Sequence, residues 1–415
     1  MSSLWPKPRK RRWWISSAAI GVGAAAASYY LYEWYQQRTA LPWSRSADAR
    51  PDTPIRAPAH AHSPLYPHQS STAPSGAPDS STGLSGEADT NLQNHFDSIQ
   101  IISERTTLPQ MLTELVKGLS RTADVSTLIM RLKGLSSASP LADEVKLETW
   151  EQLKAFSFAR LVCVVWLVPL LDLLLRVQLN ILGRHLFLES HLLDRATALA
   201  WQQTAHAPRR VTKRAQELFL EVAHYLPERG TAVVVDRMLQ AVEDALGDTR
   251  LDQTFGEEQL LSCLSAIHAE FEGWAVEQGW PQIVLPTSGE AALYFRGSLA
   301  PPDNQALAHH PSAEADEDIA RRMVGELHTI LASAKFAAAV QAAVREVART
   351  LGQSLVADLG VSPLPLAKAV PRVVAAADGF LASTSLLRAQ ALGSVAQLPQ
   401  VQKLCATVYS CGPPL

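Results

Sequence analysis

The stretch FSFARLVCVVWLVPLLDLLLRVQLNILGRHLFL, residues 156–188, decides the fold of this chain. Its charge-free run, residues 161–171, is 11 residues long, whereas a helix needs about 20 apolar residues to cross a bilayer. Arg160, Asp172 and Arg176 lie beside or inside the stretch, and an ionised group within a bilayer is costly. A second transmembrane helix is the alternative, but the pattern favours a central core helix that is apolar nearly all round. That prediction requires Asp172 and Arg176 to be paired, or to lie at the domain surface.

The rest of the chain from residue 91 onward has the period of amphipathic helices. Apolar residues recur every three or four positions, which places them on one face of a helix. Such stripes are Leu260, Leu264, Ile267, Phe271 and Trp274; Val235, Leu239, Val242 and Leu246; and Val211, Ala215, Leu218, Val222 and Leu226. Gly247 and Pro227 are expected to end the second and third stripes, and residues 318–351 are expected to form one long helix or two shorter ones. The sequence therefore predicts an all-α fold, a single large elongated helical bundle over residues 91–415.

Charge, cysteine content and motifs argue against several classes of function. The net charge of −3 over 415 residues is too small for a chain that binds nucleic acid along its length. The four cysteines lack CxxC or zinc-type spacing, which favours reduced thiols and no metal site; they are Cys163, Cys263, Cys405 and Cys411. The chain has no G-x-S-x-G elbow, phosphate loop, HExxH or paired-carboxylate motif. We therefore expect a protein that is not an enzyme and has neither catalytic residues nor a cofactor.

The N-terminus is expected to be a membrane anchor over residues 13–35. Its apolar part, from Trp13 to Tyr32, has 20 residues without charge, and as a helix it would span about 30 Å, the thickness of a bilayer core. Aromatic residues, which prefer both membrane interfaces, border it at each end. A cleaved signal peptide is the alternative, but it would have a shorter apolar region followed by small residues. The preceding tail, residues 1–12, carries a basic cluster of Lys7, Arg9, Lys10, Arg11 and Arg12.

Residues 36–90 have the composition of a disordered linker. Eight prolines lie among many Ser, Ala and Gly residues, and apolar residues are few and without pattern. Such a segment cannot bury enough apolar surface to offset the entropy lost on ordering. His60, His62 and His68 lie within it, and we expect them to be solvated rather than to bind a metal.

A candidate surface for binding a partner lies in KLETWEQLKAF, residues 146–156. On a helix Lys146, Trp150, Leu153 and Lys154 fall on one face. A Trp flanked by Lys and Leu is typical of an interface hot spot, in which the ring fills a pocket and the charges form the rim. The alternative, an ordinary core Trp, is favoured slightly by the pattern alone.

Several blocks of sequence are similar, in order, to the peroxin three family of peroxisomal biogenesis factors. The closest are KLETWEQLKAFSFAR at 146–160 and LLLRVQLNILG at 173–183. HFDSIQ at 95–100 and LPLAKAVP at 364–371 also resemble family blocks, and weaker similarity covers most of 91–415. The basic cluster, single anchor and large helical domain follow the same order as in the family.

The resemblance implies a docking receptor without catalytic activity in the peroxisomal membrane. In the family, a cytosolic all-helical domain binds an amphipathic N-terminal helix of peroxin nineteen, the soluble chaperone for membrane-protein cargo. The family's groove Trp corresponds to Trp150, with Lys146, Leu153 and Lys154 as neighbours. Leu132 and Lys133 resemble the family's Leu-Lys pair on the preceding helix, although the loop after them, residues 134–145, is longer here.

Membrane topology and alternative functions stay open at this point. The excess of positive charge before the anchor would place the N-terminus in the cytosol, whereas the resemblance implies an N-terminus in the lumen and a cytosolic domain. We follow the resemblance, and the basic cluster then belongs to a targeting signal read by the import machinery, with peroxisomal membrane lipids as a further partner of the chain. An anchored adaptor for organelle inheritance or turnover (pexophagy) is the runner-up function. A membrane-bound lipid-handling enzyme is a third, because catalytic triads scatter through sequence.

Overall fold

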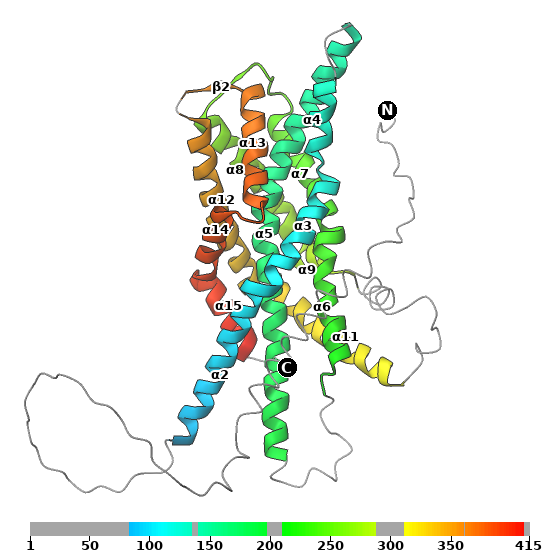
Figure 1. The fold of residues 1–415 in the computed structure, drawn as a ribbon, viewed down its shortest axis with the longest axis vertical. Helices are drawn as coiled ribbons and strands as arrows, with labels where there is room; N and C mark the ends of the chain where they lie inside the picture. The colour runs from blue at the N-terminus through cyan, green and yellow to red at the C-terminus, as the bar shows by residue number, and fades with distance from the viewer. Residues whose placement is uncertain (1–82, 135–139, 197–209, 288–310, 361, 411–415) are drawn as a thin grey trace, which may run out of the picture. The chain divides into compact units, whose positions relative to one another are not determined.

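The computed structural model describes residues 83–134, 140–196, 210–287, 311–360 and 362–410 (Figure 1). The predicted basic tail, the anchor at 13–35 and the linker up to residue 82 lie outside the described residues. From His95 onward, the described residues belong to one compact unit. The first described helix, α2 (Gly83–Ile102), begins within the last residues of the linker predicted at 36–90 and continues into this unit.

The described residues form an all-α fold, as predicted. After α2 and a π-helical turn (Ser103–Thr107) come α3 (Leu108–Thr122), α4 (Val125–Gly134), α5 (Pro140–Ala196), α6 (Lys213–Glu221), α7 (Thr231–Leu246), α8 (Glu257–Gln278), α9 (Trp280–Val284), α11 (Pro311–Leu331), α12 (Ala334–Leu359), α13 (Leu366–Leu381), α14 (Leu386–Ala396) and α15 (Pro399–Ser410). Two short antiparallel strands, β1 (Thr254–Phe255) and β2 (Leu364–Pro365), pair Thr254 with Pro365 and Phe255 with Leu364.

Helix α5 is the centre of the helical unit, and most of the other helices pack against it (Figure 1). Its segment Glu144–Ser190 is long and apolar enough to cross a membrane by length and composition, yet its most apolar window is entirely buried within the protein. By the same criterion, α11 with α12 and α13 with α14 pass only as pairs bent by 66° and 64°. The core position predicted for residues 156–188 is therefore confirmed, because α3, α4, α7, α12, α13 and α15 cover α5.

Most of the predicted apolar stripes form helices, with one difference at Pro227. The stripe at 260–274 lies on α8 and the stripe at 235–246 on α7, which ends before Gly247 as expected. Residues 318–351 divide into two helices, α11 and α12. The third stripe does not end at Pro227, because this proline lies in the first turn of a π-helical segment (Leu226–Gly230) that leads directly into α7. A proline is tolerated there, since the first turn of a helical segment has no partner for the missing N–H.

Five buried polar side chains tie α5 to the helices around it. These polar ties are Lys154, Arg160, Arg176, Gln178 and Arg184. Arg160 forms an ion pair with Asp378 of α13 at 3.0 Å, and Gln178 donates to the carbonyl oxygen of Phe219 in α6 at 2.6 Å. Arg184 pairs with Glu326 of α11 and donates to the carbonyl oxygen of Val408 in α15 at 2.9 Å. A buried polar group is costly without a hydrogen bond, so each tie also fixes the position of at least one neighbouring element.

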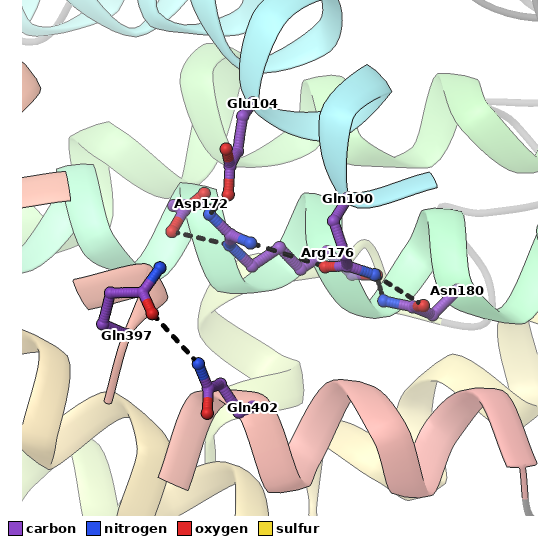
Figure 2. Close-up of polar contacts among 7 residues, drawn as sticks. All are labelled: Gln100, Glu104, Asp172, Arg176, Asn180, Gln397 and Gln402. Carbon is purple, nitrogen blue, oxygen red and sulfur yellow. Dashed lines mark hydrogen bonds and ion pairs between the residues drawn. The ribbon is translucent and has the colours of Figure 1, made fainter. Parts of the chain in front are cut away.

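The pairing required of Asp172 and Arg176 is confirmed. The Arg176 Nε atom lies 3.0 Å from both carboxylate oxygens of Asp172, which is fully buried (Figure 2). Arg176 Nη2 reaches Glu104 Oε1 at 2.9 Å, and Nη1 reaches Gln100 Oε1 at 3.4 Å. Gln100 in turn donates to Asn180 at 3.0 Å. Burial raises the pKa of Asp172, and the adjacent guanidinium of Arg176 opposes that shift.

We predict that Arg176→Leu strongly destabilises the fold. The change leaves the buried Asp172 carboxylate without its cation, and breaking a buried ion pair from one side costs about 3–5 kcal/mol. Thermal and denaturant unfolding of the full chain in detergent measures the loss. The double variant Asp172→Leu/Arg176→Leu should recover most of it, because no unpaired charge is left in the core.

The control is Lys117→Ala, which breaks the exposed Lys117–Glu114 pair and should change stability by less than about 0.5 kcal/mol. A double variant as unstable as Arg176→Leu would show instead that the cost lies in packing and not in the unpaired charge.

Candidate partner-binding surface

The candidate surface lies on α4 and the first turns of α5, two helices that pack against each other. Asp124 begins α4 by accepting hydrogen bonds from the backbone N–H and the hydroxyl of Thr127, at 3.1 and 2.5 Å. These bonds satisfy donors that the first turn of a helix otherwise leaves unpaired, and they hold the pKa of Asp124 below its usual value. Arg160 of α5 donates to the carbonyl oxygen of Ala123 at 3.2 Å, which fixes the start of α4 against α5.

Trp150 is half-buried and has an exposed apolar neighbour on the same face of α5. Leu147, three residues earlier, is 57% exposed. Lys146, one turn before Trp150, is half-buried. The ring is therefore neither fully covered, as an ordinary core Trp would be, nor fully open.

Helix α4 adds a second set of apolar and basic side chains. Leu132 is half-buried, Lys133 is exposed, and Met130 has 66% of its surface exposed. Met130 and Leu147 are missing from the sequence prediction. Helical spacing could have predicted Leu147, because it lies three positions from Trp150 and therefore on the same face. The exposure of Met130, which precedes the Leu132-Lys133 pair, is visible only in the structure.

Leu153 and Lys154 face the protein interior, which differs from their expected place on the partner face. They are 3% and 4% exposed. Lys154 Nζ donates to the carbonyl oxygens of Leu246 and Thr249, at 3.1 and 2.9 Å, and pairs with Glu151 at 2.5 Å. The cation thus satisfies carbonyl groups at the end of α7 and opposes the negative end of that helix dipole. The helical spacing placed Lys154 one turn from Trp150, but α7 covers this side of α5.

Partly or fully exposed apolar and basic side chains thus occur on both of these packed helices. They are Trp150, Leu147 and Lys146 on α5, and Met130, Leu132 and Lys133 on α4. Exposed apolar groups that lie together beside charged ones are typical of a protein interaction site. Among the residues that the structure describes, no group of three or more His, Cys, Asp or Glu side chains is placed to hold a metal ion.

Comparison with known proteins shows similarity to one family and to several of its named members. A model of the Peroxin-3 family matches residues 36–411. Peroxisome biogenesis protein 3-2 of Arabidopsis thaliana is 26% identical over 328 residues, which cover 77% of this chain and 83% of that protein. Peroxisome biogenesis protein 3-1 of the same plant is 30% identical over 204 residues, 47% of this chain and 53% of the relative. Peroxisomal biogenesis factor 3 of Mus musculus is 35% identical over 159 residues, 38% of either chain.

We predict that Lys154→Met destabilises the fold, whereas Lys146→Met does not. Methionine retains the apolar stem but removes the ammonium group, so the buried carbonyl oxygens of Leu246 and Thr249 lose a donor. An unsatisfied buried group costs about 1–3 kcal/mol, whereas a surface change costs less than about 0.5 kcal/mol. Denaturant unfolding of the two variants compares these effects. If the Lys154→Met protein is as stable as the parent but binds the partner more weakly, Lys154 contacts the partner and has no structural role.

Proposed function

Because this chain belongs to the Peroxin-3 family, we propose that it is a membrane docking receptor for the chaperone peroxin nineteen. The chain is a peroxisome biogenesis factor at the peroxisomal membrane. Within that role, it would bind peroxin nineteen loaded with membrane-protein cargo and bring the cargo next to the bilayer for insertion. The observation that carries this proposal is the half-buried Trp150 one helical turn from exposed Leu147 on α5, against which α4 with its exposed Met130 packs.

The partner would bind as an amphipathic helix laid across the candidate surface. Its apolar side would contact Trp150, Leu147 and Leu132, and the indole would supply the largest buried area. An aromatic ring that retains partial exposure in the free protein gains burial when a partner covers it. Hot spots of this kind dominate the binding energy of interfaces.

The basic side chains would select an acidic partner and set its direction. Lys133 is exposed on α4, and Lys146 is half-buried beside Trp150. Charges at the rim of an interface act mainly on the rate of association and on specificity. Leu153 and Lys154 would support partner binding indirectly. Both are buried, and the hydrogen bonds of Lys154 hold this part of α5 against the end of α7.

The proposed topology is a single membrane span with the helical domain in the cytosol. Residues 13–35 would form the anchor, residues 1–12 would lie in the peroxisomal lumen, and the linker would join the anchor to the domain. A soluble chaperone reaches its receptor only from the cytosol, so this orientation and the docking role support each other.

Trp150→Ala should weaken binding of the N-terminal helix of peroxin nineteen by about 2 kcal/mol, roughly thirtyfold in affinity. The fold itself should lose less than about 2 kcal/mol, because a half-buried ring gives up only part of its area. Titration of a labelled peptide and a thermal melt on the same purified variant measure both effects. Lys146→Ala should weaken binding less, and its effect should shrink as salt concentration rises.

The matched control is Leu386→Ala on α14, because Leu386 is 85% exposed and lies on a different helix. It should leave peptide affinity unchanged. A Trp150→Ala protein that is strongly destabilised, but whose folded fraction binds as before, would make Trp150 a core residue and reject the docking surface.

Protease added to intact peroxisomes should remove the helical domain and leave the N-terminus protected. A tag placed before residue 7 and a second tag after residue 415, both detected by immunoblot, report the two sides. Loss of the C-terminal tag alone is the expected result. Loss of the N-terminal tag alone would invert the topology, and a fusion of residues 1–45 that labels mitochondria would reject the proposed targeting signal.

A further inference from the structure

A cleft lies between α8 and α12, separate from the α4–α5 surface. Its volume is about 330 Å³, within the size range of small-ligand sites. Helix α8 contributes Ser265, His268, Ala269 and Glu272; helix α12 contributes Gln341, Val344, Arg345 and Ala348; and Trp166 of α5 completes the lining. The lining thus combines a compact apolar part with several polar side chains.

The Trp166 side chain fixes the tautomer of His268, and burial keeps the ring neutral. The indole is held by ring contacts with Phe271 and Trp280, at centroid distances of 5.0 and 5.9 Å. Its Nε1–H donates to His268 Nδ1 at 2.8 Å, and an indole can only donate. Burial lowers the pKa of His268 to about 4, so the ring is neutral at neutral pH and its remaining hydrogen is on Nε2. His268 therefore brings a hydrogen-bond donor to the cleft.

Two opposite charges face the cleft without an ion-pair partner among the described residues. They are Glu272 on α8 and Arg345 on α12, and the Nε–H of Arg345 donates to a backbone carbonyl oxygen. Two charges that neighbour them in sequence are paired elsewhere and do not compensate them: Glu270 with Arg237 at 2.7 Å, and Glu346 with Arg349 at 2.5 Å. The charges that line the cleft are thus left available for a ligand.

We propose that this cleft binds a small zwitterion, a molecule with an anionic group and an ammonium group on a compact body. The anionic group would accept hydrogen bonds from Arg345 and His268 Nε2–H, since charge-assisted bonds to a guanidinium are among the strongest in proteins. The ammonium group would pair with Glu272. The apolar part would pack on Val344, Ala269 and Ala348. Both a free amino acid and a phosphoethanolamine headgroup have this chemistry.

Calorimetric titration of the full chain in maltoside micelles tests the proposal, because this detergent has no zwitterionic headgroup. L-leucine is compared with 4-methylpentanoate, which lacks the ammonium group, and with isoamylamine, which lacks the carboxylate. Glycerophosphoethanolamine is the fourth probe. At least one zwitterion should bind about fivefold more tightly than either singly charged analogue. Preference for leucine would identify a free amino acid as the ligand, and preference for glycerophosphoethanolamine would identify a lipid headgroup.

Two variants test which group of the ligand each charged side chain binds. Glu272→Gln should weaken zwitterion binding about fivefold without weakening 4-methylpentanoate, whereas Arg345→Gln should weaken both. Glu277→Gln and Arg349→Gln change the same charges on the same helices outside the cleft lining and should have no effect. Melting temperatures verify that each variant is folded. Zwitterions that bind no better than their analogues, or binding that the two cleft variants leave unchanged, would overturn the proposal.

Discussion

Burial of α5 is the constraint on which the rest of the structure depends. The apolar part of α5, residues 156–184, would be costly to expose to water, and every helix that packs on it removes part of its apolar surface from solvent. The same burial makes polar groups on α5 costly unless they are bonded. The five polar ties meet this requirement, and each reaches a different neighbour. The hydrophobic effect therefore drives the helices to pack around α5, and the polar ties fix the positions of the elements that they reach.

The sequence predicts this core well because its signals are local. The charges of Arg160, Asp172 and Arg176 separate a buried helix from a membrane-spanning one, and the pairing of Asp172 with Arg176 follows from the cost of an isolated buried charge. Helical periodicity likewise places α7, α8 and α12. It fails at Pro227, where the residue type suggests an end but its position in a first turn permits the chain to continue as helix.

The candidate surface is less predictable, because exposure depends on what packs on the other side of a helix. Helical spacing places Trp150, Leu153 and Lys154 on related faces, yet only the structure shows that α7 covers Leu153 and Lys154. Lys154 illustrates the limit: its sequence context is equally compatible with a steering charge and with the cap of a helix 92 residues away. Met130 escapes sequence analysis for the same reason, since its exposure reflects the absence of a covering helix among the described residues and not any local pattern.

The continuity of α5 has a mechanical consequence. Over 57 residues, an α-helix extends for about 85 Å, and α5 keeps its helical course although Pro169 in its interior has no backbone N–H to donate. Trp150 lies near one end of this rod, and Arg184, bound to α11 and α15, lies toward the other. A force on the first turns of α5 is therefore carried along the helix and shared among the five polar ties. These ties oppose sliding of α5 against the elements that they reach.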